Sequence, residues 1–278
     1  MGAADVVPGV SGGTIALILG VYFQLLEAVK SFDLQFVKLL FQGRFRHGFA
    51  RIPWGFLLPL LCGILLSVFS LARLVTFLLV EHPTLLWAFF FGLILASIFI
   101  LLRQKKLRTI SAWLIFAGGV LGGWFLTGAT AISLSHSLPL IFISGFIAIC
   151  AMILPGISGS FMLVLLGQYG VVIDAVANLN ILVILVFASG CLCGLLSFAR
   201  VVSTMLTRFP VVTMAFFIGV MTGSLRAVWP WRDNGMPTPP PPVDLGVLAA
   251  GVCCIVGIVL PLSVEWLAKW KRTRQIDG

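Results

Sequence analysis

Two copies of a Pro-Gly-x-Ser-Gly motif constrain how this chain folds more than any other feature. The first copy runs from Pro8 to Gly12 and the second from Pro155 to Gly159, and both lie inside long apolar stretches. Proline lacks a backbone N–H and glycine favours non-helical backbone, so each copy interrupts a helix. Irregular backbone persists within a membrane only where protein or a water-filled cavity satisfies it. The pair therefore indicates two broken membrane segments, a sequence sign of a transporter binding site.

Composition places the chain among membrane proteins that cross the bilayer several times. Hydrophobic residues make up 60% of it and charged residues only 10%, with a mean hydropathy of +1.14. Soluble domains do not have this composition. The net charge of +9 does not indicate a nucleic-acid partner, because the basic residues lie in short loops between apolar spans. That placement is typical of the positive-inside rule of membrane topology.

We predict an all-α polytopic membrane protein built from two inverted repeats, each with a re-entrant broken hairpin and three transmembrane helices. The first repeat, residues 1–128, has these parts: hairpin 1–29, an amphipathic helix on the membrane surface within 31–53, and spans at about 54–80, 84–102 and 109–128. The second repeat, residues 138–268, has these parts: hairpin 138–173 and spans at about 180–205, 210–228 and 244–267. Residues 269–278 form a basic cytoplasmic tail.

The duplication extends beyond the motif. Several pairs recur 147 residues apart, among them Gly20/Gly167, Tyr22/Tyr169 and Glu27/Asp174, whereas later pairs such as Gly63/Gly190 and Arg73/Arg200 recur 127 apart. The difference of about 20 residues falls on the amphipathic segment of the first half. Re-entrant hairpins leave three full spans in each half, an odd number, so the second half is inverted. Hairpins that crossed completely would give parallel repeats, which the distribution of basic residues disfavours.

The two hairpin tips predict a phosphate site. Helices that begin after each break point free N–H groups toward the middle of the membrane, where they suit an anion. The candidate binding residues are the small and hydroxyl-bearing ones of both motifs: Ser11, Gly12, Gly13, Thr14, Ser158, Gly159 and Ser160. The breaks themselves are formed by Pro8, Gly9, Pro155 and Gly156. The alternative is that both motifs are helix kinks whose small residues serve tight helix packing.

Two arginines at equivalent repeat positions, Arg73 and Arg200, lie inside apolar spans. A guanidinium in the membrane is costly and usually marks a functional site, and arginine suits bidentate phosphate binding. We therefore add both to the candidate phosphate site. The alternative is that both side chains reach a membrane interface, because each lies in the last third of its span.

Three carboxylates are candidates for coupling or gating. Glu27 and Asp174 correspond by the repeat and follow the two hairpins, whereas Asp5 precedes the first motif and has Met152 as its counterpart. They are interpreted either as proton-linked or cation-linked groups or as plain interface carboxylates. No nucleophile with a neighbouring base and no metal-ligand spacing is evident. We therefore expect no enzyme and no cofactor, with coupling to a proton or cation gradient as the energy source to test.

The quoted motifs resemble the bacterial polyprenyl-phosphate transporter family of the PopT type. The resemblance rests on residues 2–14 together with 153–160 and extends over nearly the whole chain. It implies an inner-membrane protein that moves undecaprenyl phosphate from the outer to the inner leaflet, which recycles the lipid carrier for peptidoglycan and other surface polymers. Its partners would be polyprenyl phosphate and membrane lipids, with the oligomeric state open. Family members usually have more residues before the first motif, whereas here Met1 falls inside the first hairpin limb.

Two other functions remain open from the residues alone. A secondary transporter of a small anion or small solute needs a closed aqueous pathway and no lateral opening to lipid. A membrane lipid-phosphate phosphatase needs a nucleophile and an acid–base partner, which the chain does not offer at a recognisable spacing.

Overall fold

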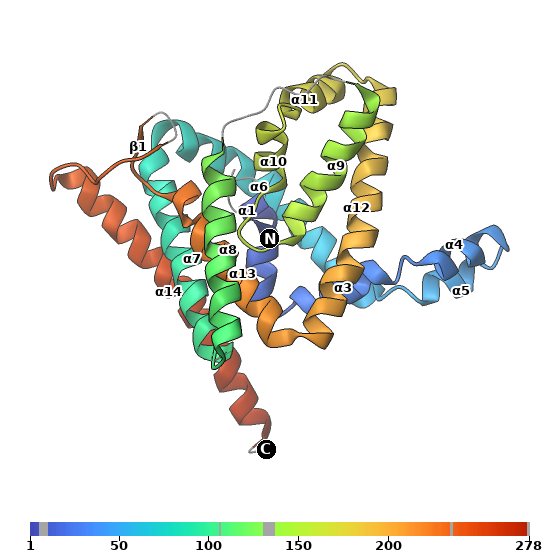
Figure 1. Cartoon of the computed structure of the whole chain (residues 1–278), viewed down its shortest axis with the longest axis horizontal. Helices are drawn as coiled ribbons and strands as arrows, with labels where there is room; N and C mark the ends of the chain where they lie inside the picture. Colours follow the sequence, from blue (N-terminus) through green and yellow to red (C-terminus); the bar gives the residue numbers. More distant parts are fainter. Residues whose placement is uncertain (6–10, 106, 130–136, 234–235, 277–278) are drawn as a thin grey trace. The chain divides into compact units, whose positions relative to one another are not determined.

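The computed structural model is almost entirely helical (Figure 1). It describes residues 1–5, 11–105, 107–129, 137–233 and 236–276. The predicted helical class is confirmed. Within the described residues the only strands are β1 (Arg232–Asp233) and β2 (Met236–Pro237), which form one short antiparallel pair in the loop before the last helix.

Six helices in the described residues are long and apolar enough to cross a membrane: α6 (Trp54–Glu81), α7 (Pro83–Lys105), α8 (Ile110–Gly128), α12 (Ile181–Arg208), α13 (Pro210–Ser224, continued by the 3-10 turn η1, Leu225–Val228) and α14 (Leu245–Ile276). A bilayer core of about 30 Å requires about 20 apolar residues per helix, which these segments supply. The polytopic membrane class predicted from hydropathy is therefore confirmed.

The two broken segments appear as short helices with sharp bends. The first comprises α1 (Gly2–Asp5), α2 (Gly12–Ile18) and α3 (Tyr22–Lys30), and the second comprises α9 (Leu138–Ile153), α10 (Gly159–Leu165) and α11 (Tyr169–Ala177). The α2–α3 pair bends by 117° and the α10–α11 pair by 109°. The limb after each Pro-Gly-x-Ser-Gly motif is thus only seven residues long and turns sharply at its end.

The same turn ends this limb in both copies. Gly20 and Gly167 both have positive φ, +72° and +68°, which glycine adopts without steric cost. The N–H of Val21 donates to the carbonyl of Ala16 at 3.0 Å, and the N–H of Gln168 donates to that of Leu163 at 2.9 Å. These are the 6→1 bonds of a glycine-terminated helix. The duplicated sequence therefore produces a duplicated local structure, while the inverted orientation and the repeat boundaries stay predictions.

The surface segment of the first half is not the single amphipathic helix that the sequence predicted. It forms two short helices, α4 (Leu34–Phe41) and α5 (Phe45–Ala50), that pack against each other. Gly43 lies between them with φ of +70°. A helix ends readily at such a residue because a side chain in that conformation would be strained.

The chain divides into two compact units. Unit 1 contains Met1–Phe69 and Ala129–Pro210, and unit 2 contains Ser70–Gly128 and Val211–Gly278. Both hairpins lie in unit 1, where α9 packs along α12. In unit 2, α7 packs along α14, and glycines of α8 and α13 bring those two helices close together. Small residues allow this kind of close approach between membrane helices.

We predict opposite effects for alanine at two glycines that the repeat makes equivalent. A Cβ built on Gly190 of α12 falls on the carbonyl oxygen of Phe142 in α9, whereas Gly63 of α6 has no described atom within 4 Å. Gly190→Ala should lower the free energy of unfolding by about 1–3 kcal/mol through overpacking. Gly63→Ala should leave it unchanged or raise it by up to about 1 kcal/mol through helix propensity. Thermal unfolding in detergent measures both, and equal effects would contradict the α9–α12 packing.

Candidate functional site

The first motif begins helix α2 in the way its sequence predicts. Ser11 is the N-cap residue, in extended conformation, and its Oγ accepts a hydrogen bond from the N–H of Gly13 at 3.1 Å. Serine is favoured here because its side chain satisfies an N–H that the helix leaves free. Ser11 and Thr14 are almost completely buried, at 1% and 0% exposure. Pro8 and Gly9, predicted to form the break, lie outside the described residues.

Side chains of the first hairpin bind the broken backbone of the second. The Ser11 hydroxyl donates to the Met152 carbonyl at 3.2 Å, and the Tyr22 hydroxyl donates to the Ile153 carbonyl at 2.8 Å. The last carbonyls of α9 have no partner within their own helix, so these bonds satisfy them. Unpaired backbone groups are costly in a membrane interior. The two motifs, more than 130 residues apart in sequence, are therefore brought together at one place.

The second motif is bound to the first at its glycine. Gly156 has φ of +91°, and its buried N–H donates to Thr14 Oγ1 at 2.8 Å. Pro155 and Gly156 thus form a break between α9 and α10, as predicted. Each predicted hydroxyl of the first motif is already engaged by backbone of the protein itself.

The two copies share backbone conformation but use their hydroxyls differently. Ser158 has extended backbone at the start of α10, like Ser11, but makes no capping bond with its side chain. Its Oγ lies 2.8 Å from Ser160 Oγ instead. A Cβ on Gly159 would lie 3.0 Å from the Ala148 carbonyl oxygen, so this position is closely packed. A role for the paired hydroxyls of Ser158 and Ser160 in phosphate binding stays a prediction.

A carboxylate already occupies the start of α2. Asp5 Oδ1 accepts a hydrogen bond from the N–H of Gly12 at 2.7 Å. This is the position at which the sequence predicts a phosphate, and negative charge is favoured there by the helix dipole. Met152 replaces this carboxylate in the second copy. A substrate anion at α2 must therefore displace Asp5 or meet it in protonated form.

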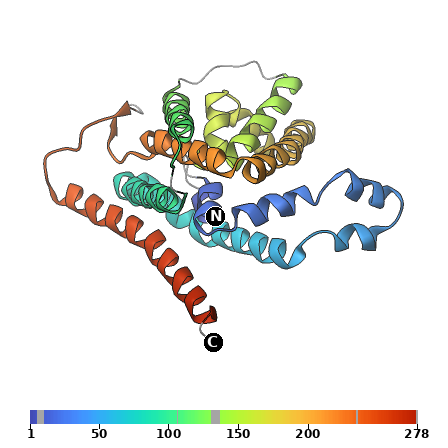
Figure 2. The same ribbon diagram turned by 60° about the horizontal axis from the view of Figure 1, so that its bottom comes forward.

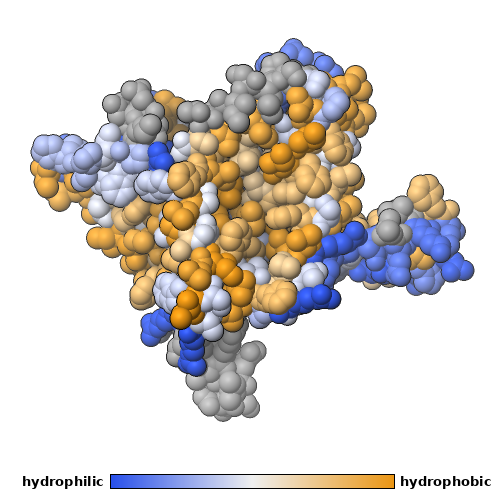
Figure 3. All heavy atoms as spheres, in the orientation of Figure 1, coloured by the Kyte–Doolittle hydropathy of each residue, from blue (hydrophilic) through white to orange (hydrophobic). Residues whose placement is uncertain are grey.

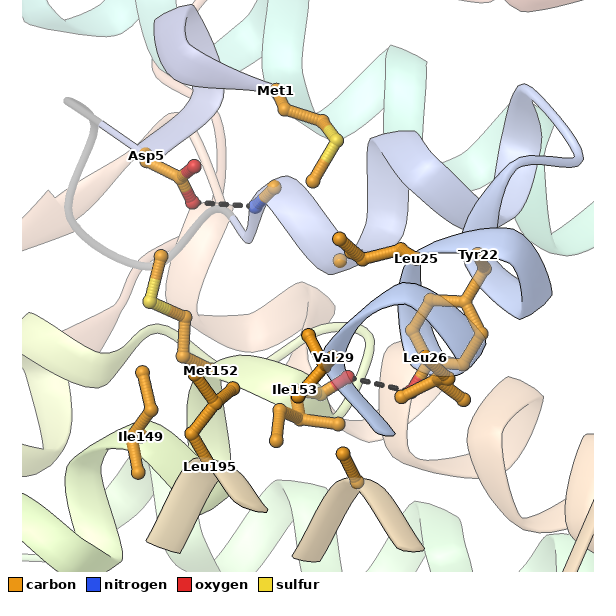
Figure 4. A pocket seen from close by; sticks show the side chains of 13 residues that line it. Met1, Asp5, Tyr22, Leu25, Leu26, Val29, Ile149, Met152, Ile153 and Leu195 are labelled. Atoms are coloured by element: carbon orange, nitrogen blue, oxygen red, sulfur yellow. Dashed lines mark hydrogen bonds between the residues drawn. The ribbon is translucent and has the colours of Figure 1, made fainter. Parts of the chain in front are cut away.

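An apolar cavity of about 130 Å³ adjoins this contact (Figure 4). Its walls come from α1, α2, α3, α9 and α12, and they include Tyr22, Leu26, Ile149, Met152 and Leu195. Asp5 is the one carboxylate among the lining residues, and Figure 4 shows its bond to the helix that follows. The cavity therefore combines an apolar interior with an anionic group and the two glycines that begin α2 at its edge.

The two arginines differ in their surroundings. Arg200 is half-buried in α12 of unit 1, directly after Ala199, which lines the cavity. Arg73 is exposed on α6 within unit 2. Neither guanidinium makes a hydrogen bond or ion pair with any residue that the structure describes. A role for either arginine in phosphate binding stays a prediction.

The other two candidate gating carboxylates, Glu27 and Asp174, also differ in their surroundings. Glu27 Oε1 lies 2.8 Å from Lys30 Nζ and accepts a hydrogen bond at 2.7 Å from Ser203 of α12. Lys30 Nζ also donates to Ser203 Oγ at 3.0 Å, which closes a three-membered polar cluster between α3 and α12. Asp174 is exposed on α11. No group of His, Cys, Asp and Glu in the described part of the chain has the arrangement of a metal site.

Sequence reasoning missed the roles of Tyr22, Lys30 and Ser203. Tyr22 carried a usable signal, because the repeat pairs it with Tyr169 and tyrosine is rare in this chain, which has two. Lys30 and Ser203 carried none, because Ser203 lies 173 residues from Lys30 and the contact depends on how α3 packs on α12.

We predict that removing the hydroxyl changes the free energy of unfolding much more at one of the two repeat-equivalent tyrosines than at the other. Tyr22 is 3% exposed and bonded to the second hairpin, whereas Tyr169 is 43% exposed. Tyr22→Phe leaves the Ile153 carbonyl without this donor, so the unfolding free energy should fall by about 1–3 kcal/mol. Tyr169→Phe should change it by less than about 0.5 kcal/mol. Thermal melts of the purified variants test this difference, and the prediction fails if both tyrosines behave alike.

A family model described as undecaprenyl phosphate translocase-like matches residues 1–238 of the chain. The chain belongs to this family. A polyprenyl-phosphate transporter of Vibrio cholerae serotype O1 is 45% identical over 238 residues, which cover 84% of this chain and 76% of that protein. A polyprenyl-phosphate transporter of Staphylococcus aureus is 35% identical over 261 residues, covering 86% of this chain and 84% of that protein. No solved structure shows a significant match. The predicted family resemblance is confirmed.

Proposed function

We propose that this member of the translocase-like family transports polyprenyl phosphate across the bacterial inner membrane. The substrate is undecaprenyl phosphate, carried from the outer to the inner leaflet, and its return recycles the lipid carrier for cell-envelope synthesis. The names of the two relatives support polyprenyl phosphate as the substrate class. Membrane lipids surround the protein, and the reaction breaks no covalent bond.

One observation carries the proposal: the start of α2 and the end of α9, where the two motifs meet, adjoin a cavity whose walls are almost wholly apolar. A small hydrated solute needs a pathway lined by polar groups, because leaving water without replacement hydrogen bonds is costly. A lipid phosphate instead needs polar donors for its headgroup beside an apolar region for its chain. The backbone of Gly12 and Gly13 at the start of α2, next to Leu26, Ile149 and Leu195, fits the second requirement.

The headgroup would bind at the start of α2, where Asp5 now accepts the Gly12 N–H. Phosphate and the Asp5 carboxylate are both anionic and compete for the same donor. Protonation of Asp5 weakens its hold on that N–H and removes the repulsion. Arg200 then supplies a positive charge from α12. In this mechanism a proton accompanies each phosphate, which links transport to a proton gradient.

The experiment is a sided transport assay in proteoliposomes. Purified protein is reconstituted with undecaprenyl phosphate, and with the uncharged polyprenol as control, and leaflet exposure is followed with and without a proton gradient. Protein-dependent movement of the phosphate but not the alcohol is the expected result. Movement of neither lipid, with or without the gradient, would overturn the proposal and favour a transporter of a small anion or solute.

A further inference from the structure

The segment inserted only in the first half forms a distinct structural feature, which we call the basic hairpin. It consists of residues 34–50, with α4 and α5 packed against each other around the turn at Gly43. Both ribbon views show it extending away from α3 and from the start of α6 (Figures 1 and 2). The corresponding connection in the second half is only residues 178–180, between α11 and α12.

The base of the hairpin is held firmly. A series of ring contacts runs from Phe32 to Phe36, from Phe36 to Phe49 and from Phe49 to Trp54, with centroid separations of 5.4, 6.1 and 5.9 Å. Arg51 forms an ion pair with Asp33 at 3.0 Å, so the charge nearest the base is neutralised. The hairpin is therefore attached to the end of α3 and the start of α6 as a packed element.

The tip of the hairpin has the opposite character. Phe41 is 89% exposed and Phe45 is 58% exposed. Lys38, Arg44 and Arg46 are exposed as well, and none of the three forms an ion pair with a described residue. Residues 34–50 contain no Asp or Glu. Figure 3 shows hydrophilic residues gathered on the projecting part, with hydrophobic atoms among them. Large exposed apolar rings beside uncompensated positive charge indicate a partner that is anionic and apolar together.

Chain connectivity places this tip at the membrane surface. Helix α3 ends the first broken segment at Lys30, and α6 begins a candidate membrane span at Trp54. A connection between two membrane segments must lie at or near the bilayer surface. The positive-inside rule assigns the face that carries Lys38, Arg44 and Arg46 to the cytoplasm, where anionic lipids attract basic segments.

We propose that the basic hairpin docks on the anionic lipid surface of the cytoplasmic leaflet. Phe41 and Phe45 insert between the headgroups, and Lys38, Arg44 and Arg46 bind lipid phosphates. Amphipathic helices with basic and aromatic residues bind membranes in this way. The hairpin thereby fixes the depth of α3 and α6 at that surface. This role does not depend on which substrate the protein transports.

Hydrogen–deuterium exchange of the full-length protein tests the docking. The protein is placed in nanodiscs of phosphatidylcholine alone or of phosphatidylcholine with phosphatidylglycerol, and exchange of residues 34–50 is followed. We expect exchange to be roughly tenfold slower with the anionic lipid, and high salt should remove most of that difference because it screens the surface charge. Exchange in α11 serves as the internal reference, since the second half lacks the hairpin.

Two sets of variants separate the contribution of the basic residues to lipid docking from that of the aromatic rings. The triple variant Lys38→Gln/Arg44→Gln/Arg46→Gln should exchange equally in both lipids. The control triple variant Arg103→Gln/Arg108→Gln/Arg208→Gln, which removes the same charge at exposed sites elsewhere, should keep the difference. Phe41→Ser/Phe45→Ser should speed exchange in both lipids.

Three outcomes would overturn the proposal. The first is equal exchange of residues 34–50 in the two lipids for the unmodified protein. The second is lipid-dependent protection that survives in the hairpin triple variant. The third is stronger protection by a soluble anionic polymer such as heparin, in phosphatidylcholine nanodiscs, than by phosphatidylglycerol, which would assign the hairpin to an anionic macromolecule instead.

Discussion

Replacing Arg200 with glutamine is expected to abolish most transport of undecaprenyl phosphate while the protein stays folded. Arg200 is half-buried, follows a residue that lines the cavity, and its guanidinium has no described partner within the protein. A hydrogen bond to a charged group contributes about 1.5–3 kcal/mol. Losing it should lower headgroup affinity roughly ten- to hundredfold. The measurements are binding of undecaprenyl phosphate in detergent and flipping in proteoliposomes.

The control for Arg200 comes from the same helix, and the repeat supplies a second variant. Arg208→Gln removes the same charge from an exposed position at the end of α12 and should leave transport near the wild-type rate. Arg73→Gln, at the repeat-equivalent position, is also expected to impair transport. Wild-type transport by both Arg73→Gln and Arg200→Gln would remove the arginines from the site. An unchanged melting temperature in the Arg200 variant is needed to separate binding from folding.

The second large effect is expected for Asp5→Asn. Asparagine keeps an oxygen that accepts the Gly12 N–H, now bonded to Asp5 at 2.7 Å, but it removes the negative charge. Without a like charge beside the headgroup, undecaprenyl phosphate should bind about tenfold more tightly, which corresponds to about 1.4 kcal/mol. Transport should also lose its dependence on a proton gradient, because Asn cannot release a proton. Binding at several pH values and gradient-driven flipping measure the two effects.

The direction in which pH changes phosphate affinity follows from competition between Asp5 and the phosphate for the Gly12 N–H. Acidification protonates Asp5 in the wild type, so its affinity for the phosphate should rise toward that of Asp5→Asn, which should itself change little. Glu81→Gln is the control, since that carboxylate is exposed at the end of α6 and has no proposed role in coupling. If Asp5→Asn binds the phosphate more tightly but its transport still depends on the proton gradient, Asp5 is not the coupling group. Weaker binding by Asp5→Asn would contradict competition.

Much of the fold was predictable because the bilayer imposes simple rules. A helix must offer about 20 apolar residues to cross, so hydropathy located α7, α8 and α12. Proline and glycine likewise predicted a break between α9 and α10 at Pro155 and Gly156. The single surface helix was a wrong prediction, because the amphipathic pattern of 31–53 does not reveal that Gly43 ends one helix and separates it from the next.

The site was only partly predictable. The sequence identified Ser11, Thr14 and Ser158 as candidate site residues, because they lie in or directly beside a duplicated motif. It did not reveal that Thr14 accepts a backbone N–H 142 residues away, or that Glu27 bonds to Ser203 across 176 residues. Such contacts depend on which faces of α3, α9 and α12 meet, and apolar periodicity does not specify this in helices that are hydrophobic on most sides.

The sequence by itself determined the family, the membrane class and the break at Pro155 and Gly156. The membrane class depends on the apolar length that a bilayer demands, and the break depends on local backbone chemistry. Tertiary structure decided that the first motif satisfies the broken backbone of the second and that Asp5 occupies the start of α2. It also decided that Gly190 is packed while its counterpart Gly63 is open. The physical reason is that backbone groups freed by a break must find partners, and only packing determines which residues supply them.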